Sequence, residues 1–158
     1  MPTLEPKIDY RLAMASDRCT IAALLEAEGL PATDLAASGV LLILAHEDGR
    51  FAGVVGIEPC GSTGLIRSLA VAPEFRGRGI GRALVEHAER LAAAGGLHTL
   101  YLLTEKATAF WTRCGYATMP RADVPAEIRE SAQFALLCPA SAICMRRALL
   151  GPSESAID

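Results

Sequence analysis

The sequence predicts an α/β fold, a mixed and mostly antiparallel sheet of about six to seven strands with flanking helices. Short apolar runs of strand type alternate along the chain with segments whose apolar residues recur at helical spacing. Asp48-Gly49 separates two of the early runs, which is a hairpin signal. A chain of 158 residues suits a single domain. We therefore expect one domain over residues 1–150, followed by a disordered tail over residues 151–158.

The first half of the chain is expected to contain four strands and two helices. Ser16 is placed to cap the first helix, which carries Ile21, Leu24 and Leu25 on one side and ends at Gly29. A short second helix is expected over residues 33–37, and residues 60–64 form a turn before the fourth strand. The four strands are expected over residues 8–13, 40–45, 51–57 and 65–71.

The second half is expected to continue as helix, strand, helix and strand, and to end in a final strand. Residues 82–94 form the longest helix, because Ile80, Leu84, Ala88 and Leu91 share one face. Pro125 suits the first position of a further helical segment that includes residues 128–137. The remaining elements are a strand over residues 99–103, a helix over 105–113, and strands over 116–119 and 141–149.

Composition and charge exclude several classes of function. Apolar residues make up 51% of the chain, but no apolar run is long enough to span a membrane, and the N-terminus has no signal-peptide pattern. A net charge of −3, with lysine only at Lys7 and Lys106, argues against nucleic acid or an anionic membrane as partner. Five cysteines without a C-x-x-C pair predict neither a disulfide framework nor a metal site. A cytoplasmic protein is the expectation.

The segment Arg76-Gly77-Arg78-Gly79-Ile80-Gly81 lies between a strand and the longest helix. Its glycines allow the backbone to approach a ligand closely, and the helix N-terminus and two arginines favour an anion. A phosphate-bearing ligand is therefore expected. Two alternatives stay open: a dinucleotide site, for which Glu105 would be the ribose-binding acid, and a simple helix-capping turn with exposed arginines. A P-loop is excluded because no Gly-Lys-Ser/Thr follows.

The flanking residues carry a resemblance to a known family. The stretch Leu69-Ala70-Val71-Ala72-Pro73-Glu74-Phe75, followed by the glycine segment and Arg82-Ala83-Leu84, resembles the acetyl-CoA motif of the GCN5-related N-acetyltransferases (GNAT). The stretch Ala107-Thr108-Ala109-Phe110-Trp111-Thr112-Arg113-Cys114-Gly115-Tyr116 is similar to the closing helix and Gly-aromatic turn of that family. The resemblance covers residues 8–150. It implies the GNAT fold, with a splayed central strand pair that holds acetyl-CoA.

The resemblance also implies which residues bind the cofactor. Backbone groups of Leu69 and Val71 would pair with pantetheine, a backbone N–H near Leu69 would polarise the thioester carbonyl, and the glycine segment would hold the pyrophosphate. Arg76 and Arg78 need not both contact phosphate. The implied cofactor residues are Leu69, Ala70, Val71, Arg76, Gly77, Arg78, Gly79, Ile80, Gly81, Arg82, Thr104 and Phe110.

The sequence departs from the family pattern at two catalytic positions. The tyrosine that often protonates the departing thiolate falls at Trp111, and the asparagine that often precedes this helix falls at Thr104. An indole cannot donate its proton as an acid would, so Tyr116 and Tyr101 become the candidate acids, with core packing as the alternative role for both. Glu58, which ends an apolar strand, is the candidate base, with a solvated strand-end carboxylate as the alternative.

Arg67 interrupts the apolar strand over residues 65–71 and must meet a carboxylate, of either the protein or the substrate. Ser68, Arg121, Arg129 and Ser141 complete the set of candidate substrate-binding residues. The stretch Cys138-Pro139-Ala140-Ser141-Ala142-Ile143-Cys144-Met145 resembles acetyltransferases encoded in bacterial arsenic-resistance operons, as do residues 57–59 and 65–71. That branch implies acetylation of a small amino-acid-like toxin, such as an arsenic- or phosphorus-containing glutamate analogue.

The expected function is thus acetyl transfer from acetyl-CoA to a small amine, by direct attack of the amine on the thioester. Two other functions stay open. One is a non-catalytic acyl-CoA-binding module, because the family tyrosine is replaced at Trp111. The other is a thiol-based arsenical-binding protein, which would require at least three of the cysteines to converge. A homodimer is possible, since dimers are common in the family.

Overall fold

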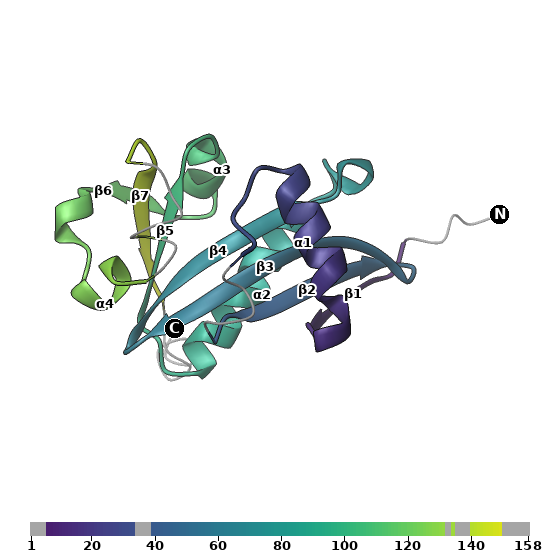
Figure 1. The fold of residues 1–158 in the computed structure, drawn as a ribbon, viewed down its shortest axis with the longest axis horizontal. Coiled ribbons are helices and arrows are strands. Elements are labelled where there is room, and N and C mark those ends of the chain that lie inside the picture. The colour runs from purple at the N-terminus through teal and green to yellow at the C-terminus, as the bar shows by residue number, and fades with distance from the viewer. Residues whose placement is uncertain (1–5, 34–38, 132–133, 135–139, 150–158) are drawn as a thin grey trace, which may run out of the picture.

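The computed structural model describes residues 6–33, 39–131, 134 and 140–149, and its strands form one seven-stranded sheet (Figure 1). The order across the sheet is β1-β2-β3-β4-β5-β7-β6. All neighbours are antiparallel except β4 and β5, which run parallel. The predicted mixed, mostly antiparallel sheet is confirmed. The strands are β1 (Ile8–Leu12), β2 (Leu41–Glu47), β3 (Arg50–Cys60), β4 (Thr63–Val71), β5 (Thr99–Thr104), β6 (Ala117–Met119) and β7 (Ile143–Ala148).

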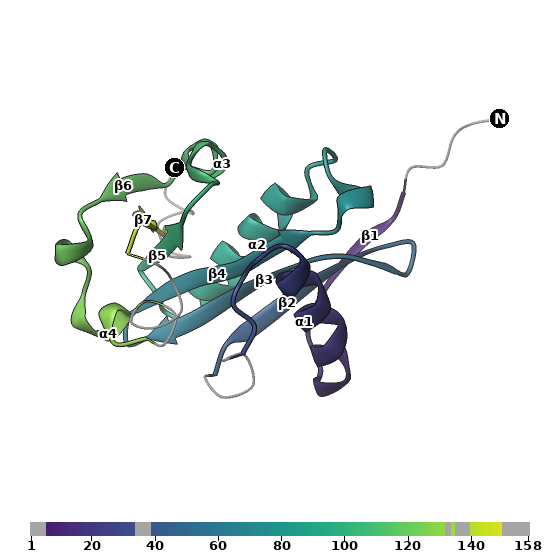
Figure 2. The ribbon, with the colours of Figure 1, turned by 45° about the horizontal axis from the view of Figure 1, so that its top comes forward.

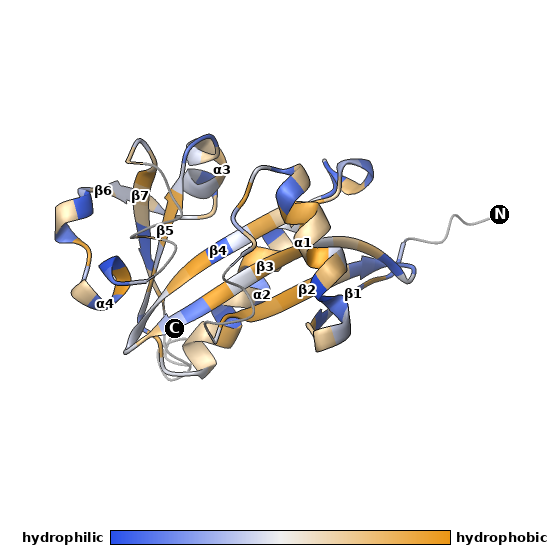
Figure 3. Ribbon diagram, in the orientation of Figure 1, coloured by the Kyte–Doolittle hydropathy of each residue, from blue (hydrophilic) through white to orange (hydrophobic). Residues whose placement is uncertain are grey.

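Two helices cover opposite faces of the sheet (Figures 1 and 2). α2 (Ile80–Ala94) buries Ile80, Leu84, Val85, Ala88 and Ala92 against one face, which is the predicted amphipathic stripe. α1 (Arg18–Ala27) buries Ile21 and Leu25 against the other face, beside Val54 and Ala70. Two shorter helices follow, α3 (Thr108–Arg113) and α4 (Ala126–Arg129). Hydrophobic residues run along β2, β3 and β4 between these layers (Figure 3).

β4 and β5 pair only at their beginnings. The parallel register runs from Thr63↔Thr99 to Leu65↔Tyr101 and includes no later residue of either strand. β4 nevertheless continues to Val71, and β5 continues to Thr104. The two strands therefore separate toward their C-terminal ends, as the predicted splayed pair requires.

A β-bulge lies in β4 beyond the last residue that pairs with β5. The pairing with β3 changes register between Val54↔Ala70 and Gly56↔Arg67, so Val55 faces two residues, Ser68 and Leu69. Ser68 has a φ of 59°, one of two positive values among the described non-glycine residues. Such a backbone costs about 1 kcal/mol or more, and it persists where the surrounding structure enforces it. The bulge thus breaks the regular ladder at the residues expected to meet the thioester.

Some element ends differ from the sequence predictions. Ser16 does not cap α1, because a 3₁₀ turn over Ala15–Asp17 precedes the helix, and the Asp17 carboxylate accepts the N–H of Met14 at 2.7 Å. Asp17 thus closes the 3₁₀ turn and occupies the N-cap position of α1, where no side-chain cap hydrogen bond forms. The Asp48-Gly49 hairpin is confirmed, with φ values of 49° and 81°. Residues 34–37 of the predicted helix over 33–37, half of the segment over 128–137, and the whole tail over 151–158 fall outside the described residues.

Candidate functional site

A cleft of about 1100 Å³ opens where β4 and β5 separate. One wall is formed by β4 from Ile66 to Val71 and by the glycine segment that follows it. The opposite wall is formed by the end of β5 and by α3, and the connection after α1 lines a third side. No sequence motif marks this third side apart from Gly29 and Pro31, which end the helix. The strand separation thus creates this cavity, which is larger than a second one of about 300 Å³ beside the start of α1.

The glycine segment makes the turn from β4 into α2. Gly77 and Gly79 have φ values of 78° and 80°, and a Cβ at either position would meet nothing within 4 Å. Glycine is therefore required there for its backbone conformation and not for lack of room. Gly81 lies in the first turn of α2, and a Cβ on it would lie 3.6 Å from Val71 Cγ2 and 3.7 Å from the Phe110 ring. Side chains at position 81 would enter the cleft between its two walls.

The two arginines of the glycine segment have different environments. Arg76 lines the cleft, where its Nε donates to the Val71 carbonyl at 3.2 Å and its guanidinium pairs with Glu28. Arg78 does not line the cleft, and it pairs with Glu47 at 2.6 Å while lying over the Phe75 ring. Of these two arginines, only Arg76 lines the cleft. Arg82, one turn into α2, also lines the cleft.

The remaining predicted cofactor residues also line the cleft, namely Leu69, Ala70, Val71, Ile80, Thr104 and Phe110. Thr104 ends β5, and its Oγ1 accepts the N–H of Ala107 at 3.1 Å, which fixes the turn into α3. Thr104, which stands where the family often has asparagine, therefore has a hydrogen-bond partner within the protein. Trp111, which stands where the sequence comparison expects the family tyrosine, lines the cleft as well.

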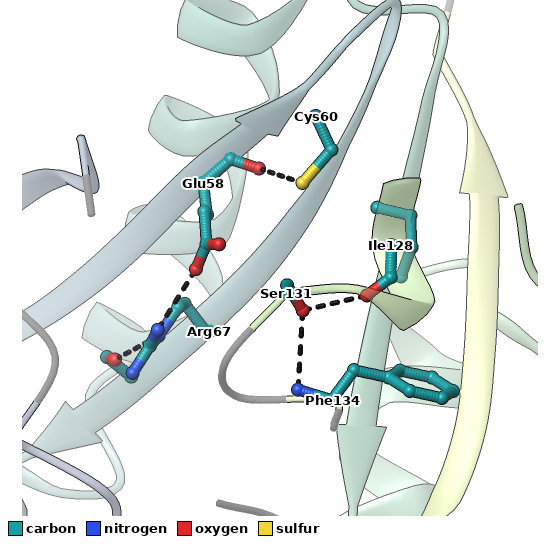
Figure 4. Close-up of polar contacts among 7 residues, drawn as sticks. Glu58, Cys60, Arg67, Ile128, Ser131 and Phe134 are labelled. Atoms are coloured by element: carbon teal, nitrogen blue, oxygen red, sulfur yellow. Dashed lines mark hydrogen bonds and ion pairs between the residues drawn. The ribbon is translucent and has the colours of Figure 1, made fainter. Parts of the chain in front are cut away.

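Arg67 and Glu58 form a buried ion pair between β4 and β3 (Figure 4). Arg67 is 2% exposed and Glu58 is 8% exposed, and Arg67 Nη1 lies 3.0 Å from Glu58 Oε1. Arg67 Nε also donates to Ser68 Oγ at 3.1 Å, in the bulge itself. The carboxylate that Arg67 was expected to meet is thus provided by the protein. Arg67 and Ser68 line the cleft but Glu58 does not, although the Arg67 side chain itself is fully enclosed.

The candidate acids Tyr116 and Tyr101 both belong to the core. Tyr116 is 2% exposed, its ring packs edge-on against Trp111, and its hydroxyl donates to Glu89 Oε2 at 3.0 Å. Burial and the Glu89 carboxylate raise the pKa of Tyr116 well above its ordinary value. Tyr101 packs with Leu65 on the other face of the sheet. Neither tyrosine is among the described residues that line the cleft.

We expect Tyr116→Phe to leave acetyl transfer almost unchanged while lowering the stability of the protein. The variant removes a hydroxyl outside the cleft and leaves Glu89 without one of its buried donors, which costs about 1–3 kcal/mol. Urea unfolding measures the stability, and steady-state kinetics measure turnover. If Tyr116 were the acid that protonates the thiolate, kcat would instead fall by about 10²-fold or more while stability changed little.

Three predicted substrate residues lie outside the cleft lining. Arg121 Nη1 donates to the carbonyls of Ala140 and Ala142, and its guanidinium lies over the Phe134 ring. Arg129 is exposed on α4, and Ser141 Oγ donates to Glu105, which itself lines the cleft. Ala142 lines the cleft, so Arg121 holds the chain that precedes β7 at the rim. Arg121 thus holds the chain before β7 in place, a role that no sequence motif indicates.

The described thiols do not form a reactive cluster. Burial raises the pKa of Cys60 and of Cys144 to about 11, and it raises the pKa of Cys114 as well. Among the described residues, no group of three histidines, cysteines or acidic side chains is placed to hold a metal ion. Because the thiolate is the form that binds arsenicals and metals, protonated thiols give little support to an arsenical-binding function.

No described helix is both long and apolar enough to cross a bilayer.

The part of the chain that forms this cleft matches a known protein family. Residues 12–116 match the model of the acetyltransferase (GNAT) family, which is more than half of the chain. An uncharacterized N-acetyltransferase of Chlorobaculum tepidum is 43% identical over 63 residues, which is 40% of each protein. The matched segment therefore spans less than half of this curated relative. The family match includes the glycine segment and α3, and it removes the dinucleotide alternative and the simple-turn alternative.

Solved structures share the fold at low sequence identity. N-acetylglutamate synthase of Neisseria gonorrhoeae, complexed with coenzyme A and N-acetyl-glutamate, has a TM-score of 0.77 at 21% identity, over 93% of this chain and 36% of that protein. A Mycobacterium tuberculosis protein in complex with coenzyme A has a TM-score of 0.76 at 23% identity, over 90% of this chain and 99% of that one. Each solved structure is similar in fold to the described sheet and helices.

Proposed function

The chain belongs to the acetyltransferase (GNAT) family, a family of N-acetyltransferases that use acetyl-CoA, and from this premise we propose that it acetylates a small amine in the β4–β5 cleft. The observation that carries this proposal is the placement of two features on one cleft. The bulge at Ser68 and Leu69 lies at one end, and the glycine segment before α2 lies at the other. A thioester and a pyrophosphate are the two groups that such a pair of features would hold.

The cofactor would bind along β4 in the space that β5 leaves. Backbone groups of Leu69, Ala70 and Val71 would pair with pantetheine in place of a neighbouring strand. The N-terminus of α2 and the glycine segment would receive the pyrophosphate, with Arg76 and Arg82 supplying positive charge from the lining. Charge-assisted hydrogen bonds contribute about 1.5–3 kcal/mol each, so this end would dominate cofactor affinity.

The reaction needs a neutral amine and a donor for the tetrahedral oxyanion. A backbone N–H at the bulge, released from regular pairing with β3, would be such a donor at Leu69. The departing thiol has an ordinary pKa of about 8.5, so protonation by a side chain is helpful but not essential. A lysine-type amine costs about 4.6 kcal/mol to deprotonate at pH 7, whereas an α-amino group costs about 1.4. A site without a strong base therefore suits an α-amine.

We propose that the acceptor also carries an anionic group, which Arg67 receives. Arg67 is the buried cation of the cleft lining, and it lies in β4 next to the bulge where the thioester would sit. Glu58 lies behind it and fixes the guanidinium, so we assign Glu58 a positioning role beside its earlier role as candidate base. An amino-acid-like acceptor fits this arrangement, and an arsenic- or phosphorus-containing glutamate analogue is the toxin of that class that we propose.

The test is release of free coenzyme A from acetyl-CoA in the presence of a panel of amines, read with a thiol reagent. We expect release with α-amino acids that carry a second anion, and slower release with neutral amines of the same size. Tight acetyl-CoA binding without release for any amine would establish the non-catalytic binding module instead. Faster release with neutral amines would contradict the anionic acceptor while leaving the acetyltransferase activity in place.

A further inference from the structure

An ion pair joins the wall of the cleft that carries the glycine segment to the third side, which the connection after α1 forms. Arg76, which follows β4, pairs with Glu28, which follows α1, although 48 residues separate them in the sequence. Both residues line the cleft. This contact is the point where the connection after α1 (residues 28–33) is tied to the segment that would bind phosphate.

Arg76 is anchored on the β4 side and reaches across from there. Its Nε donates to the carbonyl of Val71, the last residue of β4, at 3.2 Å, and a different nitrogen, Nη2, contacts Glu28. The contact with β4 thus uses a different nitrogen from the contact with Glu28. The pair is partly open to solvent, with side-chain exposures of 53% for Arg76 and 27% for Glu28. Such pairs are weakly held and can be exchanged for a more highly charged partner.

The connection over residues 28–33 also touches the part of β4 where transfer would occur. Leu30 and Ala32 pack against the cluster that contains Val54 and Ala70, and Ala70 is in the strand one residue beyond the bulge pair. Residues 29–33 line the same cleft as Arg67 and Ser68. A change in the position of residue 28 would therefore shift residues that line the cleft together with Arg67 and Ser68.

We propose that Glu28 is an affinity-determining residue that competes with a phosphate of the cofactor for Arg76. Acetyl-CoA binding exchanges the Glu28 carboxylate for a phosphate oxygen and releases residues 28–33 from the glycine segment. This inference rests on the proposed function, since it takes the phosphate ligand of the cleft to be acetyl-CoA.

The competition predicts a specific pattern in a double-mutant cycle. Glu28→Gln removes the competing charge and should tighten acetyl-CoA binding by about 3–5-fold at low salt, while Arg76→Ala should weaken it by about 10-fold or more. In the Arg76→Ala background, Glu28→Gln should change the affinity by less than about 1.5-fold, because the competition has been removed. Simple repulsion between Glu28 and phosphate would instead give the same gain in both backgrounds.

A matched control comes from the other arginine of the glycine segment. Glu47→Gln breaks the pair between Glu47 and Arg78, which lies outside the cleft lining, and should leave acetyl-CoA affinity unchanged. Calorimetry measures the affinities of the four cycle members and of this control. A loss of affinity in Glu28→Gln, an equal gain in both backgrounds, or a similar gain in Glu47→Gln would overturn the proposal.

Amide hydrogen exchange separates failure of this inference from failure of the proposed function. In the protein without cofactor, Glu28→Gln should speed exchange at residues 28–33, and adding acetyl-CoA to the wild type should do the same. If the wild type does not bind acetyl-CoA, the proposed function fails, yet the exchange of the ligand-free variant still reports whether the ion pair holds the connection. Unchanged exchange in that variant would overturn the inference alone.

Discussion

Gly81→Trp is expected to abolish acetyl-CoA binding, weakening the affinity by about 10²-fold or more. A side chain on Gly81 starts 3.6 Å from Val71 Cγ2 and 3.7 Å from the Phe110 ring, between the two walls of the cleft. An indole there would fill the space beside the first turn of α2, where the pyrophosphate is proposed to lie. Calorimetry with acetyl-CoA measures the affinity, and circular dichroism checks that the variant is folded.

Gly81→Ala is the matched control for this variant. The contacts of its Cβ are ordinary van der Waals distances, and alanine is a better helix residue than glycine. We therefore expect unchanged or slightly higher stability, with affinity within about 3-fold of the wild type. Gly79→Trp should also lose the cofactor, but Gly79 has a φ of 80°, so any side chain there strains the backbone as well. Unchanged acetyl-CoA affinity in Gly81→Trp would contradict the assignment of the pyrophosphate site.

The second large effect is expected from Arg67→Leu, which should lower the free energy of unfolding by about 3 kcal/mol or more. The substitution leaves Glu58, a residue that is 8% exposed, without the guanidinium that lies 3.0 Å from its carboxylate. A buried charge without its partner is strongly destabilising, even where the intact pair adds little. Urea unfolding measures the change, and an unchanged midpoint would contradict the buried pair as described.

The double variant Arg67→Leu/Glu58→Gln separates the structural role of Arg67 from its proposed role toward the acceptor. Removing both charges should restore most of the lost stability, so that kinetics are measured on folded protein. In that variant we expect KM for an anionic acceptor to rise by about 10²-fold, while the affinity for acetyl-CoA is kept. A KM for anionic acceptors equal to that of the wild type would leave Arg67 with a structural role only.

Much of the fold followed from local patterns in the sequence. The apolar stripe of α2 and the Asp48-Gly49 turn each specify their structure through a few neighbouring residues, and both are confirmed. The splayed pair was expected from the family resemblance, and its cause is visible only in the register of β4 against β3 and β5. No pattern of hydrophobicity shows that Val55 faces both Ser68 and Leu69.

The site was harder to predict because its contacts join distant segments. Arg67 was correctly expected to meet a carboxylate, but strand pairing decides that the partner is Glu58. Tyr116 follows a glycine turn that the family motif emphasises, yet packing against Trp111 and the bond to Glu89 place it in the core. No sequence motif marks Glu28, since only the fold brings the end of α1 to Arg76. Such pairings depend on topology and not on spacing along the chain.

The most direct test of acetyl transfer in this cleft is product analysis by mass spectrometry, with acetyl-CoA and an α-amino acid that carries a second anion. The wild type and Gly81→Ala should form the N-acetylated amine in amounts equal to the coenzyme A released, and Gly81→Trp should form neither. Acetyl-CoA consumed without an acetylated amine, or an equal yield of acetylated amine from Gly81→Trp, would contradict transfer in the β4–β5 cleft.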